Sequence, residues 1–182
     1  MSSTISLRPK GSSGLVVARA QADEAPIIAN LMQFYIHDFS ELWFDREVEG
    51  ELGPDGRYSD YPDLEAYWKE PSRTPWLFRI GGLPVGFALV NDVAHAPTPV
   101  DQAVAEFFVV RKHRRRGVGL AAAHALFGSA WGVWEAAVVR RNVAALSFWR
   151  RAVASYPGVR DIVEEDRHDA QWDGAVLRFR AG

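Results

Sequence analysis

One short segment of the chain, residues 111–119, combines cationic side chains with glycines in a pattern suited to binding an anion. Five of the six residues from 111 to 116 are lysine or arginine, and Gly117 and Gly119 follow directly. Arginine forms bidentate, charge-assisted hydrogen bonds with phosphate. Glycine lets phosphate oxygens approach the backbone because it has no Cβ. The segment therefore predicts a phosphate-binding loop.

The residues around this loop predict that a strand runs into it and that a helix leaves it. Residues 104–110 are apolar except for Glu106, and residues 120–127 are rich in alanine. A helix that begins at the glycines offers free backbone N–H groups and the positive end of its dipole to an anion. The segment therefore has the chemistry to hold a diphosphate.

Three interpretations of this loop remain open from the residues alone. It can be a solvated basic turn. It can also be a dinucleotide-binding loop, since Gly117-x-Gly119-x-x-Ala122 matches the loosest form of that fingerprint. That fingerprint closely follows the first strand of its domain, whereas more than 100 residues precede it here. The third interpretation is a loop for coenzyme A, whose diphosphate and 3′-phosphate carry several negative charges.

Hydrophobic spacing predicts a mixed set of strands and helices around the loop. Gly81-Gly82 between two apolar runs predicts a β-hairpin, and Asp23 and Asn142 predict helix N-caps. The strands on either side of residues 120–130 must run parallel because a helix connects them. The predicted strands span residues 15–18, 76–80, 83–90, 104–110, 134–139, 159–163 and 175–179, and the predicted helices span 27–35, 39–43, 64–69, 120–127 and the segment after Asn142.

The composition is that of an ordinary globular protein and excludes several classes of chemistry. The chain has 182 residues, 48% of them hydrophobic and 24% charged. It has no cysteine, which excludes disulfides, thiolate metal sites and a cysteine nucleophile. The five histidines are scattered, which predicts no metal site. The net charge of −2 predicts no nucleic-acid partner.

The same composition predicts the domain organisation and the location of the protein. Residues 1–14 are rich in serine and glycine and predict a flexible N-terminal segment, followed by a single domain at 15–182. No run approaches the roughly 20 apolar residues of a membrane span, and residues 1–14 lack the apolar core of a signal peptide. We therefore expect a cytoplasmic protein with no membrane partner.

Two motifs in order resemble those of the GNAT superfamily of N-acetyltransferases. Arg114-x-x-Gly117-x-Gly119 is similar to the acetyl-coenzyme A motif of that family, and Asn142-x-x-Ala145-x-x-Phe148-Trp149 is similar to its second motif. The resemblance covers about residues 15–180. It implies an α/β (α+β) fold with a mixed, mostly antiparallel central sheet flanked by helices.

The resemblance also implies a function. The expected reaction moves an acetyl group from acetyl-coenzyme A to an amine of a small molecule or peptide, directly in a ternary complex because no cysteine can carry the group. The alternative on the same fold is a non-catalytic domain that binds or senses acyl-coenzyme A. Some members of the family are homodimers, so a homodimer is a further expectation.

The cofactor would be held largely by backbone groups. In such enzymes the N–H groups of the first motif bind the diphosphate, and the preceding strand pairs with the pantetheine arm and polarises the thioester carbonyl. Arg114 would hold the loop or a phosphate, Arg111 or Lys112 would reach the 3′-phosphate, and Asn142 would bind the pantetheine or order a water. The remaining residues implied are Phe108, Val109, Val110, Arg115, Arg116, Gly117, Val118, Gly119 and Leu120.

Glu106 is the candidate general base, because it is a lone carboxylate in an apolar strand. Burial would raise its pKa toward a useful range, although it can equally be a solvent-facing residue. Many family members carry the carboxylate three residues earlier, where this chain has Ala103. The usual general-acid tyrosine is replaced by Trp149, which cannot supply a proton at neutral pH. Either Tyr156 or a water would then protonate the thiolate, or no acid is needed.

The acceptor would lie against the first helix and a late loop. Tyr35, Asp38 and Glu41 are the candidates from the helix, where Asp38 or Glu41 would bind a cationic amine and Tyr35 would mainly pack. Trp172 would close the site from the other side. Each of the two carboxylates can instead simply be solvated.

Overall fold

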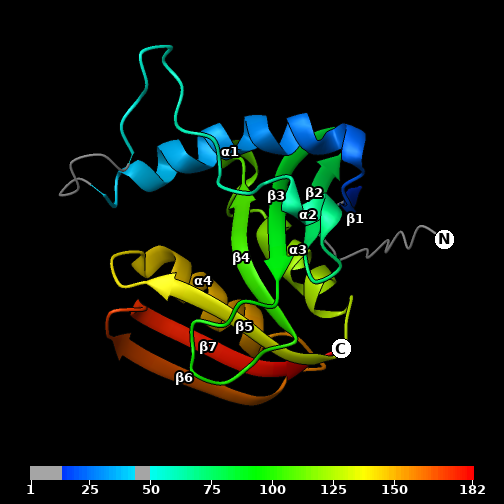
Figure 1. Ribbon diagram of the computed structural model, residues 1–182. Coiled ribbons are helices and arrows are strands. Elements are labelled where there is room, and N and C mark those ends of the chain that lie inside the picture. Colours follow the sequence, from blue (N-terminus) through cyan, green and yellow to red (C-terminus); the bar gives the residue numbers. More distant parts are fainter. Residues whose placement is uncertain (1–13, 44–49) are drawn as a thin grey trace.

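The computed structural model describes residues 14–43 and 50–182 and contains one seven-stranded sheet. The strand order is β1-β2-β3-β4-β5-β7-β6, and every neighbouring pair is antiparallel except β4 and β5 (Figure 1). This is the predicted mixed, mostly antiparallel sheet. The strands are β1 (Leu15–Arg19), β2 (Thr74–Ile80), β3 (Leu83–Asn91), β4 (Gln102–Val109), β5 (Gly132–Val139), β6 (Arg160–His168) and β7 (Asp173–Ala181).

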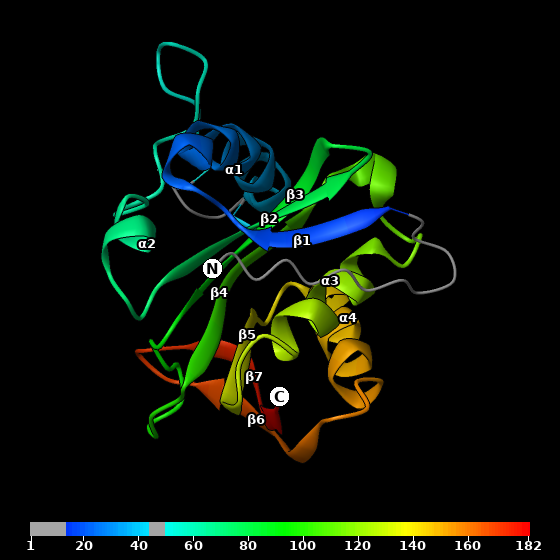
Figure 2. The same cartoon turned by 90° about the vertical axis from the view of Figure 1, so that its right-hand side faces the viewer.

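Four α-helices cover the two faces of the sheet. They are α1 (Ala25–Ser40), α2 (Ala66–Lys69), α3 (Val118–Phe127) and α4 (Val143–Ala154). Helices α1 and α2 lie on one face of β1–β4, and α3 and α4 lie on the other (Figure 2). Each pair buries its own core: Phe87 and Phe108 face α1, whereas Phe78 and Trp134 face α3 and α4. The sheet is therefore held from both sides along its centre.

Two local signals correctly predicted elements of this fold. The Gly81-Gly82 pair forms the turn between β2 and β3, with Ile80 opposite Leu83. Both glycines have positive φ, which the tight hairpin turn requires. Asn142 is the N-cap of α4, and its side-chain oxygen accepts a hydrogen bond of 3.1 Å from the Ala145 N–H. These features depend only on neighbouring residues.

Helix α1 differs from the prediction at both of its ends. Its N-cap is Glu24 rather than Asp23, because Gln21 and Glu24 form a capping box around a preceding 3-10 turn. The helix then runs unbroken to Ser40 rather than stopping before a second helix at 39–43. Phe39 continues the apolar face of α1, because its ring centroid lies 5.2 Å from that of Tyr35, four residues earlier.

Strand β6 extends beyond the predicted 159–163, because its second half is charged and carries no apolar signal. Its pairing with β7 continues as far as His168 opposite Asp173. Of the predicted N-terminal segment 1–14, all but Gly14 lies outside the described residues. In the described part of the chain no helix is long and apolar enough to cross a membrane.

Candidate active site

Strands β4 and β5 are paired at one end and separate at the other (Figure 1). Their parallel pairing covers three residue pairs, from Gln102 opposite Trp134 to Val104 opposite Ala136. On its other edge β4 stays paired with β3 as far as Val109. Within the described residues, the edge of β4 that faces β5 therefore has no strand partner beyond Val104, and a gap opens at the centre of the sheet.

The backbone of β4 presents hydrogen-bonding groups to this gap. The Val110 N–H, which we expected to face the cofactor, instead donates to the Val85 carbonyl in β3 at 2.9 Å. Because backbone groups alternate in direction along a strand, those of Phe107 and Val109 face the gap. An extended ligand can therefore pair with β4 where β5 has turned away.

The loop after β4 ends in a glycine whose conformation opens the start of α3. A 3-10 turn covers Arg111–His113, and Gly117 is the N-cap of α3. Gly117 has a φ of 80°, which favours glycine, and a Cβ there would meet no atom within 4 Å. The first hydrogen bond of the helix runs from the Ala121 N–H to the Gly117 carbonyl at 2.9 Å. The N–H groups of residues 118–120 are thus available to an anion.

The second glycine of the motif has a different role from the first. A Cβ on Gly119 would lie 3.3 Å from the ring of Phe148 and 3.8 Å from that of Phe107. The absence of a side chain at Gly119 therefore lets α3 approach α4 and β4 closely. Gly117 keeps space open for a ligand, whereas Gly119 keeps space for aromatic packing.

The cationic side chains of the loop divide into two groups. Arg111 and Arg114 are both ion-paired with Asp38 of α1, and the Arg111–Asp38 distance is 2.6 Å. Arg114 also donates a 2.6 Å hydrogen bond from Nε to the Val109 carbonyl and lies over the Phe108 ring. The other cations, Lys112, Arg115 and Arg116, are exposed and form no ion pair within the described residues.

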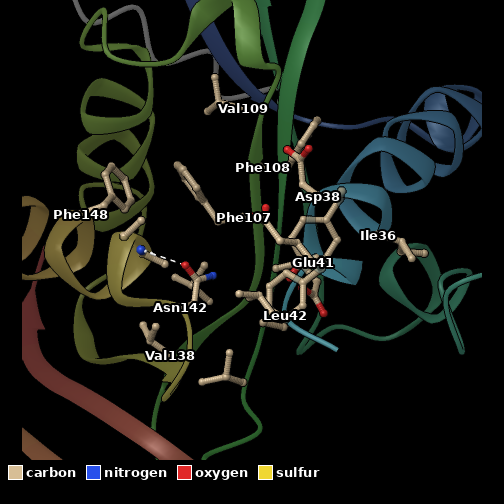
Figure 3. Close-up of a pocket in the computed structure, with 18 of the residues that line it drawn as sticks. Ile36, Asp38, Glu41, Leu42, Phe107, Phe108, Val109, Val138, Asn142 and Phe148 are labelled. Carbon is tan, nitrogen blue, oxygen red and sulfur yellow. Dashed lines mark hydrogen bonds between the residues drawn. The ribbon is translucent and has the colours of Figure 1, made fainter. Parts of the chain in front are cut away.

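Asp38 was expected to offer a carboxylate to a cationic amine, but its carboxylate is occupied by the two arginines. Burial favours the neutral carboxyl, and the hydrogen bonds from Arg114 and Arg111 outweigh this effect, so the pKa of Asp38 is lowered. Asp38 thereby ties the first helix to the loop that begins α3. Glu41, one turn later, is exposed and lines the same cleft as Asp38 (Figure 3).

Asn142 faces the gap from the opposite side, at the start of α4 (Figure 3). Its side-chain oxygen is used in capping the helix. An asparagine amide also carries two N–H donors, and the residue lines the cleft between α1 and α4. Asn142 can therefore cap α4 and donate to a ligand at the same time.

Trp149 stands where the family has its general-acid tyrosine, and Tyr156 is the other acid considered. Both side chains pack against aromatic rings. The side chain of Trp149 is buried among aromatic rings, with the Phe148 and Phe107 centroids 5.0 and 5.1 Å away. Tyr156 lies beyond the other end of α4 from Asn142, about 20 Å along the helix axis, and packs on Phe127. Neither residue therefore offers a tyrosine hydroxyl at the Asn142 end of α4.

Glu106 points from β4 toward α1, between two tyrosines. The hydroxyls of Tyr35 and Tyr61 interact with its carboxylate. Removal from water raises the pKa of Glu106, and these hydroxyls and the charge of His95 oppose the rise only in part. Burial, together with the charge of Glu106, raises the pKa of both phenols, so they remain hydrogen-bond donors. Glu106 is therefore a carboxylate with increased proton affinity in the cleft wall.

His95 and Glu135 form a pair beside this site that the sequence did not reveal. Glu135 of β5 is fully buried and accepts hydrogen bonds from the His95 backbone N–H at 2.6 Å and from its ring Nδ1 at 3.2 Å. Arg178 of β7 lies 3.2 Å from the other carboxylate oxygen. Desolvation favours the neutral acid, but the His95 and Ala96 hydrogen bonds outweigh it and lower the pKa of Glu135. A lone glutamate in the apolar 134–139 run was the one signal for this pair.

The glycine loop, Asn142, Glu106 and His95 line one cleft of about 1170 Å³. This volume exceeds the usual range of roughly 300–1000 Å³ for a small-molecule site, so a long cofactor and an acceptor can share it. Trp172 lies at its edge with its ring centroid 4.3 Å from that of His95, and its indole N–H is buried without a partner among the described residues. Of the predicted site residues, the cleft is lined by Tyr35, Asp38, Glu41, Glu106, Phe108, Val109, Arg111, Arg114, Arg115, Gly117, Gly119, Leu120, Asn142 and Trp172, and Val110, Arg116 and Val118 lie outside this lining.

Solved structures of acetyltransferases share this fold. An acetyltransferase from Thermus thermophilus matches 94% of this chain and 99% of its own, with a TM-score of 0.62 and 17% identity. PaiA N-acetyltransferase from Thermoplasma acidophilum, in complex with coenzyme A, matches 91% and 98%, with a TM-score of 0.54 and 9% identity. The Salmonella typhimurium protein yncA, with its cofactor acetyl-coenzyme A, matches 92% of both chains, with a TM-score of 0.51 and 15% identity.

The sequence carries an independent family signal. No curated protein sequence matches the chain. A family model described as the acetyltransferase (GNAT) family matches residues 31–153, a range that includes the second half of α1, the split between β4 and β5, the glycine loop and nearly all of α4. This match confirms the resemblance carried by the two motifs. The chain belongs to the GNAT family of acetyltransferases.

Proposed function

We propose that this chain transfers the acetyl group of acetyl-coenzyme A to an amine, directly within a ternary complex. The observation that carries the proposal is the position of Glu106: a carboxylate of raised pKa lines the same cleft as the glycine loop, on the strand whose edge is free. A base at that place is needed if the acceptor arrives as an ammonium group, which must lose a proton before it attacks.

The residues of the cleft fit acetyl-coenzyme A. The free N–H groups of residues 118–120, next to the open side of Gly117, would hold the diphosphate. Lys112, Arg115 and Arg116 carry charges that no acidic side chain of the described chain neutralises, and they would meet the phosphates. The backbone of Phe107, the N–H of Val109 and the amide of Asn142 would hold the pantetheine arm. When bound, the cofactor supplies an acetyl group activated as a thioester.

The acceptor would lie on the other side of β4, between α1 and the edge formed by Trp172. That wall is lined by aromatic rings, among them Tyr35, Phe39 and Trp43, and by the carboxylates of Glu41 and Glu106. Aromatic faces and carboxylates both attract cations. This lining favours a compact amine with an apolar body, and leaves Asp38 to organise the loop rather than to bind the acceptor.

Each group of the site would have a separate role in the reaction. Glu106 would take the proton of the amine, while Tyr35 and Tyr61 hold its carboxylate in place. An N–H on the free edge of β4 would donate to the carbonyl oxygen as negative charge develops there. Trp149 cannot protonate the leaving thiolate. A thiol has a pKa of about 8.5, so a thiolate can leave near neutral pH without an acid from the protein.

A turnover assay with a panel of amines tests the proposal. The purified chain is mixed with acetyl-coenzyme A and primary amines that differ in size and aromatic content, and both the free thiol and the acetylated amine are measured. We expect both products in equal amounts with at least one apolar amine. Matched alcohols test whether the acceptor atom is nitrogen. Tight binding of acetyl-coenzyme A without turnover of any amine would instead support a sensing domain.

A further inference from the structure

The loop between β3 and β4 places His95 in the cleft, and the buried side chain of Glu135 holds its ring. His95 lines the cleft with Glu106 and Trp172, and its side chain is 30% exposed. The ring is anchored at Nδ1 by Glu135, whose own side chain is fully buried. A carboxylate is only an acceptor, so Nδ1 carries the hydrogen of this bond when Glu135 is ionised. The other ring nitrogen, Nε2, is then an acceptor.

Several hydrogen bonds and one ion pair hold the loop that carries His95. Glu135 accepts from the His95 N–H and Nδ1, and from the Ala96 N–H at 3.4 Å. Arg178 pairs with Glu135 and also donates to the Thr98 carbonyl at 2.7 Å and the Pro99 carbonyl at 2.6 Å. Charged groups from β5 and β7 thus determine both the loop path and the orientation of one imidazole. On the cleft side Trp172 packs edge-on against that ring.

Resting on the proposed function, we propose that His95, oriented by Glu135, receives the amine proton from Glu106 and passes it to solvent. The proton leaves the ammonium nitrogen for a Glu106 oxygen and then moves through water in the shared cleft to His95 Nε2, which becomes an imidazolium N–H. The imidazolium releases a proton to water at the exposed edge of the ring, and no electron pair is gained or lost by the protein. Glu106 returns to its carboxylate form for the next turnover.

The surroundings of the two groups favour this direction of transfer. Glu106 is held within the protein by Tyr35 and Tyr61, whereas His95 reaches solvent. Imidazole is the side chain that gains and loses a proton most readily around neutral pH. The carboxylate of Glu135 holds the Nδ1 side of the ring and so orients Nε2, as a buried carboxylate orients the histidine of the serine hydrolase triad. His95 acts through Glu106, so it is a relay residue and not a group that touches the amine.

Two substitutions separate this relay from a purely structural role. The Nδ2 of asparagine in H95N can keep the hydrogen bond to Glu135, but asparagine has no titrating nitrogen. We expect H95N to lose about 10²-fold in kcat, at the lower end of the usual effect of a proton-transfer group. The KM values for acetyl-coenzyme A and for the amine, and the melting temperature, should stay close to those of the wild type.

Chemical rescue provides the second measurement. In H95G, added imidazole should restore kcat in proportion to its concentration, and H95A serves in its place if H95G melts early. Wild-type kcat in H95N, or no rescue by imidazole in a folded variant, overturns the relay. If E106Q remains inactive while H95N is fully active, the proposed function stands without the relay. A wild-type enzyme that acetylates no amine overturns both.

Discussion

Arg114 of the glycine loop is ion-paired with Asp38 of α1, across the 76 residues that separate them in the chain. The same guanidinium donates to the Val109 carbonyl at the end of β4. One arginine thus joins the wall where the acceptor is expected to the loop where the phosphates are expected. The motif arginine is a structural link between the two halves of the cleft.

Replacing Asp38 with asparagine should weaken this link in a pH-dependent way. Because the pKa of Asp38 is lowered in the folded protein, its ion pairs stabilise the fold above the unfolded pKa of about 3.9, and this contribution is lost as the pH falls through the lowered value. We expect D38N to destabilise the protein by about 0.5–1 kcal/mol at pH 7, since both arginines are partly exposed. Thermal unfolding should show the wild type and D38N converging below pH 4. A constant difference at all pH values would contradict the ion-pair explanation.

Gly117 can be tested against a glycine of matched conformation. G117A places a methyl group in the open space beside the free N–H groups and imposes a left-handed conformation on alanine, which costs about 1–2 kcal/mol. The control is G82A in the β2–β3 turn, where φ is 81° and a Cβ also meets nothing within 4 Å. Both variants should lose similar stability. Only G117A should weaken acetyl-coenzyme A binding, by about tenfold or more, as measured by calorimetry. Equal affinity in the two variants would show that the phosphate site lies elsewhere.

Gly119 should respond differently, because a side chain at this position would meet the ring of Phe148. G119V would push a branched side chain into a ring that lies 3.3 Å from the first added carbon. Overpacking of this kind costs about 1–3 kcal/mol. In a double-mutant cycle, F148L should recover part of the stability lost in G119V. Additive losses in the double variant would show that the two positions do not interact.

Asn142 combines capping with a free amide, and two substitutions distinguish them. N142A removes the cap and should cost about 1 kcal/mol of stability, whereas N142S keeps a capping oxygen. Neither variant retains the amide N–H donors. We expect both to raise the KM for acetyl-coenzyme A, and only N142A to lower the melting temperature clearly. A normal KM in N142S would limit Asn142 to its role in the helix.

The sequence was most informative where a feature depends on adjacent residues. The hairpin at Gly81-Gly82, the Asn142 cap and the glycine loop are local, and each was predicted with its position. The family motifs lie in these same local features. They therefore supported the fold class and the family.

What the sequence could not reveal depends on pairs that are distant along the chain. His95 and Glu135 are 40 residues apart, and no local sequence pattern indicates that they pair. The Asp38 ion pairs and the two tyrosines around Glu106 were missed for the same reason. The place where β4 and β5 separate coincides with a register shift in the β3–β4 pairing, between Leu89 and Val90, and no residue pattern marks it. Local chemistry predicted the cofactor loop, and tertiary contacts define the acceptor side.

The role of Glu106 is best tested by a change that removes its charge and keeps its shape. E106Q should lower kcat about 10²–10⁴-fold, the usual share of a general base, and leave the affinity for acetyl-coenzyme A unchanged. The loss should shrink at high pH, because more of an amine with a pKa of about 10.4 is then already neutral. E41Q is the matched control, since Glu41 lines the same cleft but is exposed. Equal losses in the two variants would contradict a specific base.

The pH dependence of stability supplies a test of Glu106 that does not require turnover. Its pKa is raised in the folded protein, so the folded state binds this proton more tightly than the unfolded state does. Stability is therefore lost as the pH rises from the unfolded pKa of about 4.3 through the raised value, and the loss persists above it. E106Q carries no charge at any pH and should melt at a higher temperature than the wild type at pH 8, with the gain disappearing below pH 4. A lower melting temperature for E106Q at pH 8 would mean that the carboxylate stabilises the fold, and that its position in the cleft reflects structure rather than catalysis.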